Sequence, residues 1–85
     1  MTNTSWSENK NKLEKKFQFN KYQDVMTFVN QVMQIANTQN HHPEISVHFN
    51  FVTVLITDYD KGGVSEKCHR FISEVDRITV ANFLL

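Results

Sequence analysis

The sequence predicts an α+β protein: an antiparallel four-stranded sheet, made of two hairpins, with two long helices packed on one face. Three patterns lead to this prediction. Apolar residues alternate with polar ones in an early segment, recur at steps of three and four in two later segments, and crowd together between Ile45 and Tyr59. A chain of 85 residues is expected to fold as a single domain, residues 1–85.

The first hairpin is predicted near the N-terminus. The stretch SENKNK follows Trp6 and is rich in turn-forming residues, so it is expected to turn one short strand back on the next. In that next strand Leu13, Phe17 and Phe19 share one face, while charged residues fill most of the alternate positions. This alternation is typical of a strand with one wet face, and we expect Asn20 to end it.

The first helix is expected to begin near Asn20, which can form a variant capping box with Gln23, and to run for about 17 residues. Pro43 disfavours helical geometry in the residue before it, so the helix should end near Gln39 or Asn40. The apolar positions recur at helical spacing: Val25, Phe28, Val29, Val32, Met33 and Ala36.

The second hairpin and the second helix follow. The run ISVHFNFVTVLITDY is too long and too apolar for one half-buried strand, so we expect Asn50 to divide it at a left-handed turn. DYDKGG is expected to be a loop, and Ser65 to cap the next helix. The tail VANFLL either extends that helix or packs elsewhere. The predicted apolar stripe is Val64, Cys68, Phe71, Ile72, Val75 and Ile78.

Composition argues against several classes of function. Nine Lys and Arg balance nine Asp and Glu, so no net charge draws the chain to nucleic acid or to an anionic membrane. An apolar run of about 18 residues is absent, as is a secretory leader, and the single cysteine cannot form an internal disulfide. We therefore expect a cytoplasmic protein with no direct nucleic-acid partner and no membrane partner.

Two adjacent histidines, His41 and His42, lie between the first helix and Pro43. Imidazoles have ordinary pKa values near 6.5, so a pair that faces a pocket can give and take protons at neutral pH. The alternative is structural, because a histidine near a helix C-terminus gains from the helix dipole. A metal site is disfavoured, since adjacent histidines on an extended segment point apart and no carboxylate or cysteine lies at helical spacing.

Three further side chains are weaker candidates. His48 either faces a pocket beside the histidine pair or is an ordinary strand residue whose bonds are satisfied. His69 falls off the apolar stripe of the last helix and is expected in solvent. Cys68 falls on that stripe and is expected to be a small buried hydrophobe and not a nucleophile.

The stretch HHPEISVHFNFVTVLITDYDKGGVSEK resembles the pterin-4a-carbinolamine dehydratases. That family has a His-His-Pro, an aromatic residue six positions past the proline, a Val-Thr-Val-like strand, a Thr-His pair, Gly-Gly or Ala-Gly, and Ser/Thr-Glu opening the final helix. The resemblance extends back through KKFQFNKYQDVMTFVNQV to Trp6, with Leu13 seven residues later, and covers the chain to about Ile78. By this resemblance His41 and His42 match the histidine pair, Pro43 the proline and Phe49 the aromatic residue.

The chain departs from the family pattern at several places. Asn37 stands where an acidic residue is common, and Cys68 stands in the place of an aspartate early in the last helix. Tyr59 occupies the position of the third active-site histidine, with Asp58 at the preceding threonine. Five residues come before Trp6, so we expect the helix that usually precedes the tryptophan in the family to be absent.

The resemblance implies a dehydratase of pterin cofactor recycling, which removes water from a 4a-hydroxytetrahydropterin to give the quinonoid dihydropterin without metal or organic cofactor. Tyrosine, with a pKa of about 10, stays protonated at pH 7, so Tyr59 would donate and not act as a base. Neighbouring strand residues point to opposite faces, so Tyr59 and Asp58 are not expected both to serve. The expected catalytic residues are His41, His42 and Tyr59; the expected substrate-binding residues are Pro43, Phe49, Asp58 and His48.

A different class of function competes with the enzyme: a binding, dimerisation or assembly module that keeps the fold after losing efficient catalysis. Some relatives within the resembled family are dimerisation partners of a homeodomain transcription factor, and others resemble assembly chaperones of carbon-fixing bacteria. Family members form dimers and tetramers through strand edges and helices. Apolar residues on both faces of the second hairpin also exceed what two helices can cover, so a homodimer or homotetramer is expected.

Overall fold

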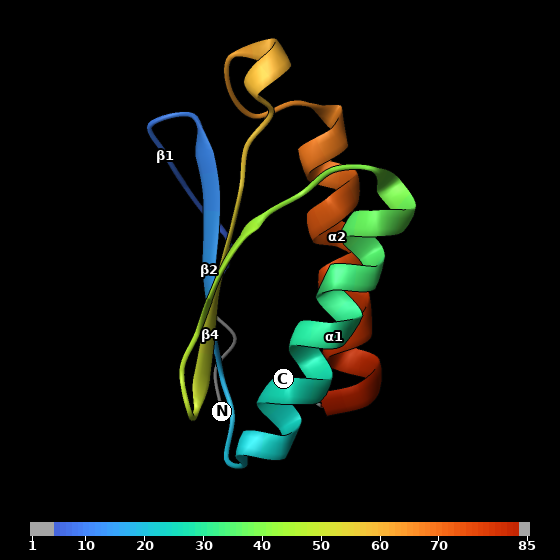
Figure 1. Cartoon of the computed structure of the whole chain (residues 1–85). Helices are drawn as coiled ribbons and strands as arrows, with labels where there is room; N and C mark the ends of the chain where they lie inside the picture. The colour runs from blue at the N-terminus through green and yellow to red at the C-terminus, as the bar shows by residue number, and fades with distance from the viewer. Residues whose placement is uncertain (1–4, 84–85) are drawn as a thin grey trace.

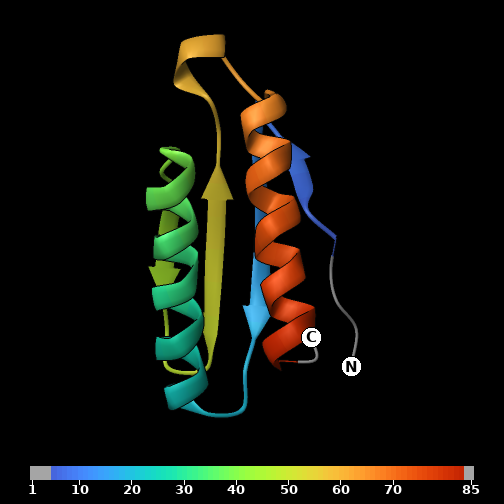
Figure 2. The same ribbon diagram turned by 90° about the vertical axis from the view of Figure 1, so that its right-hand side faces the viewer.

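The computed structural model describes residues 5–83. Its strands form one antiparallel sheet in the order β1-β2-β4-β3, and both long helices cover the same face of that sheet (Figures 1 and 2). The predicted α+β class is therefore confirmed. The elements in chain order are β1 (Ser7–Asn9), β2 (Lys12–Gln18), α1 (Tyr22–Gln39), β3 (Glu44–Val47), β4 (Phe51–Ile56), the short 3-10 helix η1 (Tyr59–Lys61) and α2 (Glu66–Phe83).

The first hairpin turns where the sequence predicts. Lys10 and Asn11 form its two-residue loop, with φ angles of 52° and 67°. Two consecutive positive φ angles match a type I′ turn, whose twist suits the flanking strands. Asn11 also packs against the loop after β4, because its Cβ lies 3.0 Å from where a Cβ on Gly63 would be. The tip of the first hairpin thus supports the loop that carries η1.

Helix α1 ends as predicted but starts differently. Asn40 adopts the left-handed conformation, with φ 53°, and its backbone N–H bonds to the carbonyls of Ala36 and Asn37. The predicted capping box is wrong: the N-cap is Lys21, which forms no side-chain cap bond, and Asn20 lies one residue too early. Met33 is 55% exposed and does not belong to the core stripe. The buried residues of α1 are Val25, Phe28, Val32, Ile35 and Ala36.

The second hairpin and α2 follow the prediction, with one difference in the turn. The turn spans residues 48–50 and is closed by a bond from the His48 N–H to the Phe51 carbonyl. Asn50 divides the run as expected, but it is not among the described residues with positive φ. Helix α2 continues to Phe83, so the tail extends it; the last two residues lie outside the described range. Its buried residues are Cys68, Phe71, Val75, Ile78 and Thr79.

The core lies between the sheet and the two helices. Phe28 of α1 is fully buried, with its ring centroid 4.7 Å from that of Phe17 and 5.1 Å from that of Phe19. Phe71 of α2 is also fully buried. Burying a side chain of this size contributes about 1.5–3 kcal/mol, so these rings hold the helices against the sheet. Among the described residues no helix is long and apolar enough to cross a membrane.

Candidate active site

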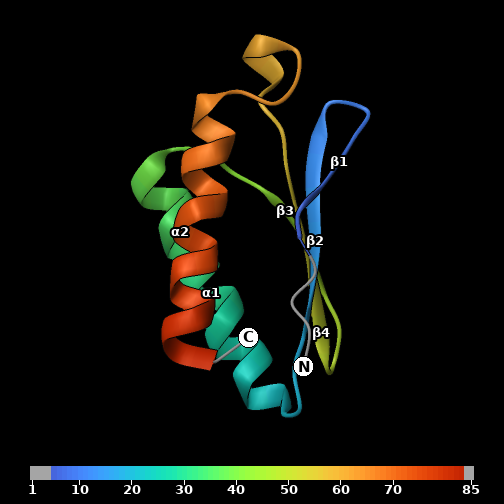
Figure 3. The same ribbon diagram turned by 180° about the vertical axis from the view of Figure 1, so that it is seen from behind.

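The histidine pair lies at the end of the molecule where α1 finishes, η1 projects and α2 begins (Figures 1 and 3). The left-handed turn at Asn40 directs the chain out of α1 and toward β3. A cleft of about 320 Å³ opens here. Its lining comes from the exit of α1, the loop after β4 and the first turn of α2: Asn40, His41, His42, Thr57, Asp58, Tyr59, Asp60 and Lys67.

His41 is the buried member of the pair, at 8% exposure. Its Nε2 lies 3.4 Å from Sγ of Cys68, and its ring meets that of Phe71 edge-on. Burial lowers the pKa of His41 below 6.5, the charge of Lys67 lowers it further, and Asp58 partly opposes them. The imidazole is therefore mainly neutral at pH 7.

His42 and Tyr59 form the open side of the cleft, whereas the predicted site residue Pro43 is not among the residues that line it. His42 is exposed and Pro43 is half-buried. Tyr59 is 78% exposed, and its hydroxyl donates to Oε2 of Glu44 over 3.4 Å. A bond of this length is weak, so the phenol can turn toward an occupant of the cleft. The structure therefore brings both histidines and Tyr59 together at one cleft.

Asp58 is buried, and both of its carboxylate oxygens are engaged. Oδ1 accepts the Asp60 N–H at 3.1 Å, and Oδ2 accepts the Ser65 hydroxyl at 2.6 Å. The bond from Ser65 is the main cause of the lowered pKa of Asp58. Its backbone also pairs with Gly63. A carboxylate that is so well bonded is a poor base, and its evident work is to join the η1 loop to the start of α2.

His48 and Phe49 lie elsewhere. They occupy the β3–β4 turn, at the opposite end of the sheet from η1 (Figure 3), and neither lines the cleft of its own chain. His48 stacks on Phe51 at 4.0 Å, and its Nε2 lies 3.3 Å from the Ser46 hydroxyl oxygen. The sequence analysis offered His48 as a pocket residue or a strand residue, but it is the first residue of the turn after β3 and does not line the cleft. Phe49 is 74% exposed.

Sequence reasoning missed Lys67 and the role of Cys68. Lys67 lines the cleft from the first turn of α2, and its charge acts on His41. Cys68 is fully buried as predicted, yet it also contacts His41. The available signal was that Cys68 lies in the first turn of α2 and stands where the resembled family has an aspartate. Within residues 5–83 no cluster of three His, Cys, Asp or Glu side chains is arranged to hold a metal ion.

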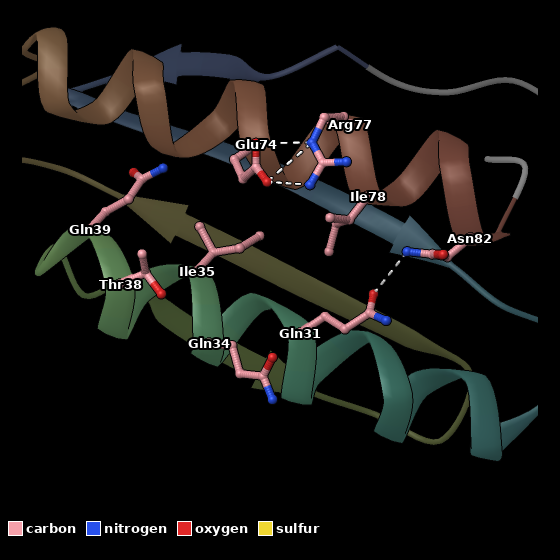
Figure 4. A pocket seen from close by; sticks show the side chains of 9 residues that line it. All are labelled: Gln31, Gln34, Ile35, Thr38, Gln39, Glu74, Arg77, Ile78 and Asn82. Carbon is pink, nitrogen blue, oxygen red and sulfur yellow. Dashed lines mark hydrogen bonds and ion pairs between the residues drawn. The ribbon is translucent and has the colours of Figure 1, made fainter.

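A second hollow, of about 400 Å³, lies between α1 and α2 (Figure 4). Its charged pair, Glu74 and Arg77, is joined by an ion pair, and Asn82 donates to Gln31 across the hollow at 3.4 Å. The rest of its lining consists of amides, Thr38 and two isoleucines. None of the lining residues titrates near neutral pH, so the cleft with the histidine pair is the better candidate for acid–base chemistry.

The fold and the cleft together define a small α+β protein in which two adjacent histidines line a cleft beside the ends of its helices. A family model described as pterin 4 alpha carbinolamine dehydratase matches residues 1–78. The chain belongs to this family, and the predicted resemblance is confirmed.

Relatives and solved structures agree with this membership. Two proteins provisionally named as pterin-4-alpha-carbinolamine dehydratases are similar over 86% of this chain. One, from Sulfurisphaera tokodaii, is 33% identical over 78% of its own length, and one from Koribacter versatilis is 36% identical over 74%.

Two solved structures share the fold. A transcriptional coactivator/pterin dehydratase from Brucella melitensis has a TM-score of 0.83 at 22% identity and covers 89% of this chain and 83% of its own. A pterin dehydratase-like protein, identified as a RuBisCO assembly factor of the alpha-carboxysome, has a TM-score of 0.76 at 22% identity, covering 88% and 89%.

Proposed function

We propose that this protein is a dehydratase that removes water from a 4a-hydroxytetrahydropterin and yields the quinonoid dihydropterin. The observation that carries the proposal is the pair His41 and His42 at one cleft, one side chain buried and neutral, the other exposed. Loss of water requires a donor toward the leaving hydroxyl and an acceptor for a proton of the pterin ring. Each such assistance is worth about 10²–10⁴ in rate, and the reaction needs no cofactor.

The remaining cleft residues support this chemistry in different ways. Tyr59 offers a hydroxyl donor at the mouth, where the family pattern has a third histidine. Pro43 does not line the cleft, and its part is to restrict the backbone directly after the histidines. Asp58 serves indirectly, by fixing the loop that presents Tyr59.

The test is the rate at which chemically generated 4a-hydroxytetrahydropterin loses water with wild-type protein and with His42→Ala. We expect the wild type to accelerate the reaction, and the variant to lose about 10²–10⁴ of that acceleration. His69→Ala is the matched control, because it removes another exposed imidazole, one that does not line the cleft. Equal activity in wild type and His42→Ala would contradict the assignment.

The second candidate is a binding or assembly module, and the specific observation in its favour is Tyr59 in place of the third histidine. The structural relative identified as a RuBisCO assembly factor is an example of a protein with this fold that acts in assembly. The two functions separate in the same assay with Tyr59→His. If the wild type does not accelerate dehydration and Tyr59→His does, the chain is a scaffold whose catalytic set is incomplete.

We further propose that two copies associate through β3. This strand ends the sheet order, so within the described chain its outer edge has no neighbouring strand, and open edges favour pairing. Antiparallel pairing of two β3 strands would bring Phe49 of one copy toward Pro43 of the other, which gives this distant aromatic residue a route to a cleft. Light scattering after gel filtration should give a multiple of the chain mass, and Val47→Lys should reduce it. A monomeric wild type would contradict the proposal.

A further inference from the structure

The buried contact between Cys68 and His41 joins two residues that lie 27 positions apart in the chain. Cys68 belongs to the first turn of α2 and is fully buried, and His41 belongs to the exit of α1. The distance of 3.4 Å between Sγ and Nε2 permits a hydrogen bond of either polarity. The polarity matters, because it decides which ring nitrogen of a neutral imidazole carries the proton.

The bonds around Cys68 indicate that the thiol is the donor. Ser65 has one hydroxyl proton, and the short 2.6 Å bond to Oδ2 of Asp58 uses it. Ser65 therefore has no proton for the thiol, from which its oxygen lies 4.0 Å away. Nε2 of His41 is the nearer acceptor for the S–H. The opposite polarity would leave the S–H with only the distant Ser65 oxygen among the contacts of the described residues.

The other ring nitrogen of His41 faces the cleft. Among the described residues no buried side-chain nitrogen or oxygen lacks a hydrogen-bond partner. Nδ1 has no bond within this part of the chain, so it reaches solvent, and the cleft is the space that His41 lines. An occupant of the cleft therefore meets Nδ1.

We propose that Cys68 donates its S–H to Nε2 of His41 and thereby holds the neutral imidazole as its Nδ1–H tautomer. His41 then presents a hydrogen-bond donor, and not a base, to the cleft. Cys68 is a positioning residue in this arrangement, since it acts through His41. As a division of labour in dehydration, the inference rests on the proposed function. The Nδ1–H of His41 donates a hydrogen bond to the departing hydroxide, and the exposed His42 takes the ring proton, which then converts that hydroxide to water.

The test is ¹⁵N NMR of the histidine rings at a pH where His41 is neutral, with the nitrogen shifts of wild type, Cys68→Ala and Cys68→Ser compared. We expect the protonated nitrogen of wild type to be Nδ1. In Cys68→Ala a larger share of the neutral His41 rings should carry the proton on Nε2. Cys68→Ser keeps an O–H donor and should restore much of the Nδ1–H tautomer. Val75→Ala is the control for a loosened core, because it removes a buried side chain of the same helix without touching His41.

Two results would overturn the inference: wild type with its proton on Nε2, or an unchanged tautomer in folded Cys68→Ala. The readout needs no turnover, so an inactive wild type would contradict the proposed function and leave the tautomer result standing. If the wild type is active, Cys68→Ala should change its pH–rate profile in a way that Val75→Ala does not, and an identical change in both would argue against positioning.

Discussion

The side chains at the cleft are of two kinds. Some face an occupant of the cleft, and others hold the first kind in place. His42 and Tyr59 are exposed at the mouth, while His41 lines the cleft from a buried ring. Asp58 and Cys68 are buried and bond to protein groups. Under the proposed function the chemistry therefore depends on these supporting bonds as well as on the exposed side chains.

The lowered pKa of His41 makes stability depend on pH. Burial and Lys67 disfavour the imidazolium, so below about pH 6.5 the unfolded chain binds a proton that the folded chain resists. The stabilising contribution is thus complete above the ordinary value and is lost as the pH falls through the lowered pKa. We predict that acidification from about pH 7 to about pH 5 lowers the Tm of wild type more than that of His41→Gln. His69→Gln, which removes an exposed imidazole, is the control and should behave like wild type. An equal fall in Tm for wild type and His41→Gln would contradict the prediction.

Asp58 is predicted to matter for the loop more than for the chemistry. Asp58→Asn leaves the Ser65 hydroxyl without its strong acceptor and weakens the anchor of the η1 loop. We expect a lower Tm together with a reduced rate, whereas Asp60→Asn, on the exposed side of the same loop, should change Tm little. The measurement is thermal unfolding beside the dehydration assay. An inactive Asp58→Asn with wild-type Tm would instead assign the carboxylate a direct part.

The helices and strands show which local rules can be applied from sequence. Pro43 and Asn40 end α1 where the sequence predicts, because both act on the backbone of their own neighbourhood. The capping box fails because the helix starts at Tyr22, so Lys21 and not Asn20 holds the N-cap position. Packing against the sheet decides that boundary, and packing is not visible in a four-residue pattern.

The turn at Asn40 joins a helix end to the site, so it offers a test of both. A left-handed conformation costs most residues about 1–2 kcal/mol, and valine suffers this cost without asparagine's local hydrogen bonding. We predict that Asn40→Val lowers the free energy of unfolding by about that amount relative to Asn40→Gly, in urea titrations. The glycine variant should keep the dehydration rate. Equal stability of the two variants would show that the turn is not under this constraint.

The fold of the whole chain could be predicted from the sequence more completely than the residues of the cleft could. Alternation and helical spacing placed the two hairpins and the two helices, since each pattern is local and repeats. The cleft joins Lys67 and Cys68 to the histidine pair across the molecule, and no spacing rule relates residues so far apart. The adjacent histidines were already candidates from the sequence itself and the resemblance matched them to the family's pair, whereas the structure supplied their unequal burial.

The small core makes the whole molecule sensitive to one ring. Phe28 is fully buried among three other phenylalanines, and Phe→Ala in a core costs about 3–5 kcal/mol, against a total stability of about 5–15 kcal/mol for a typical domain. We predict that Phe28→Ala lowers the free energy of unfolding by about 3–5 kcal/mol in urea denaturation. Met33→Ala, exposed on the same helix, should stay within about 0.5 kcal/mol of wild type. A large cost at Met33 would contradict its assignment to the surface.

The central claim is that the histidine pair performs acid–base chemistry on a pterin carbinolamine, and the most direct test is the dehydration rate with wild type beside folded His42→Ala. The account predicts that the wild type accelerates loss of water and that His42→Ala loses about 10²–10⁴ of the acceleration. A correctly folded wild type that leaves the spontaneous rate unchanged would contradict it.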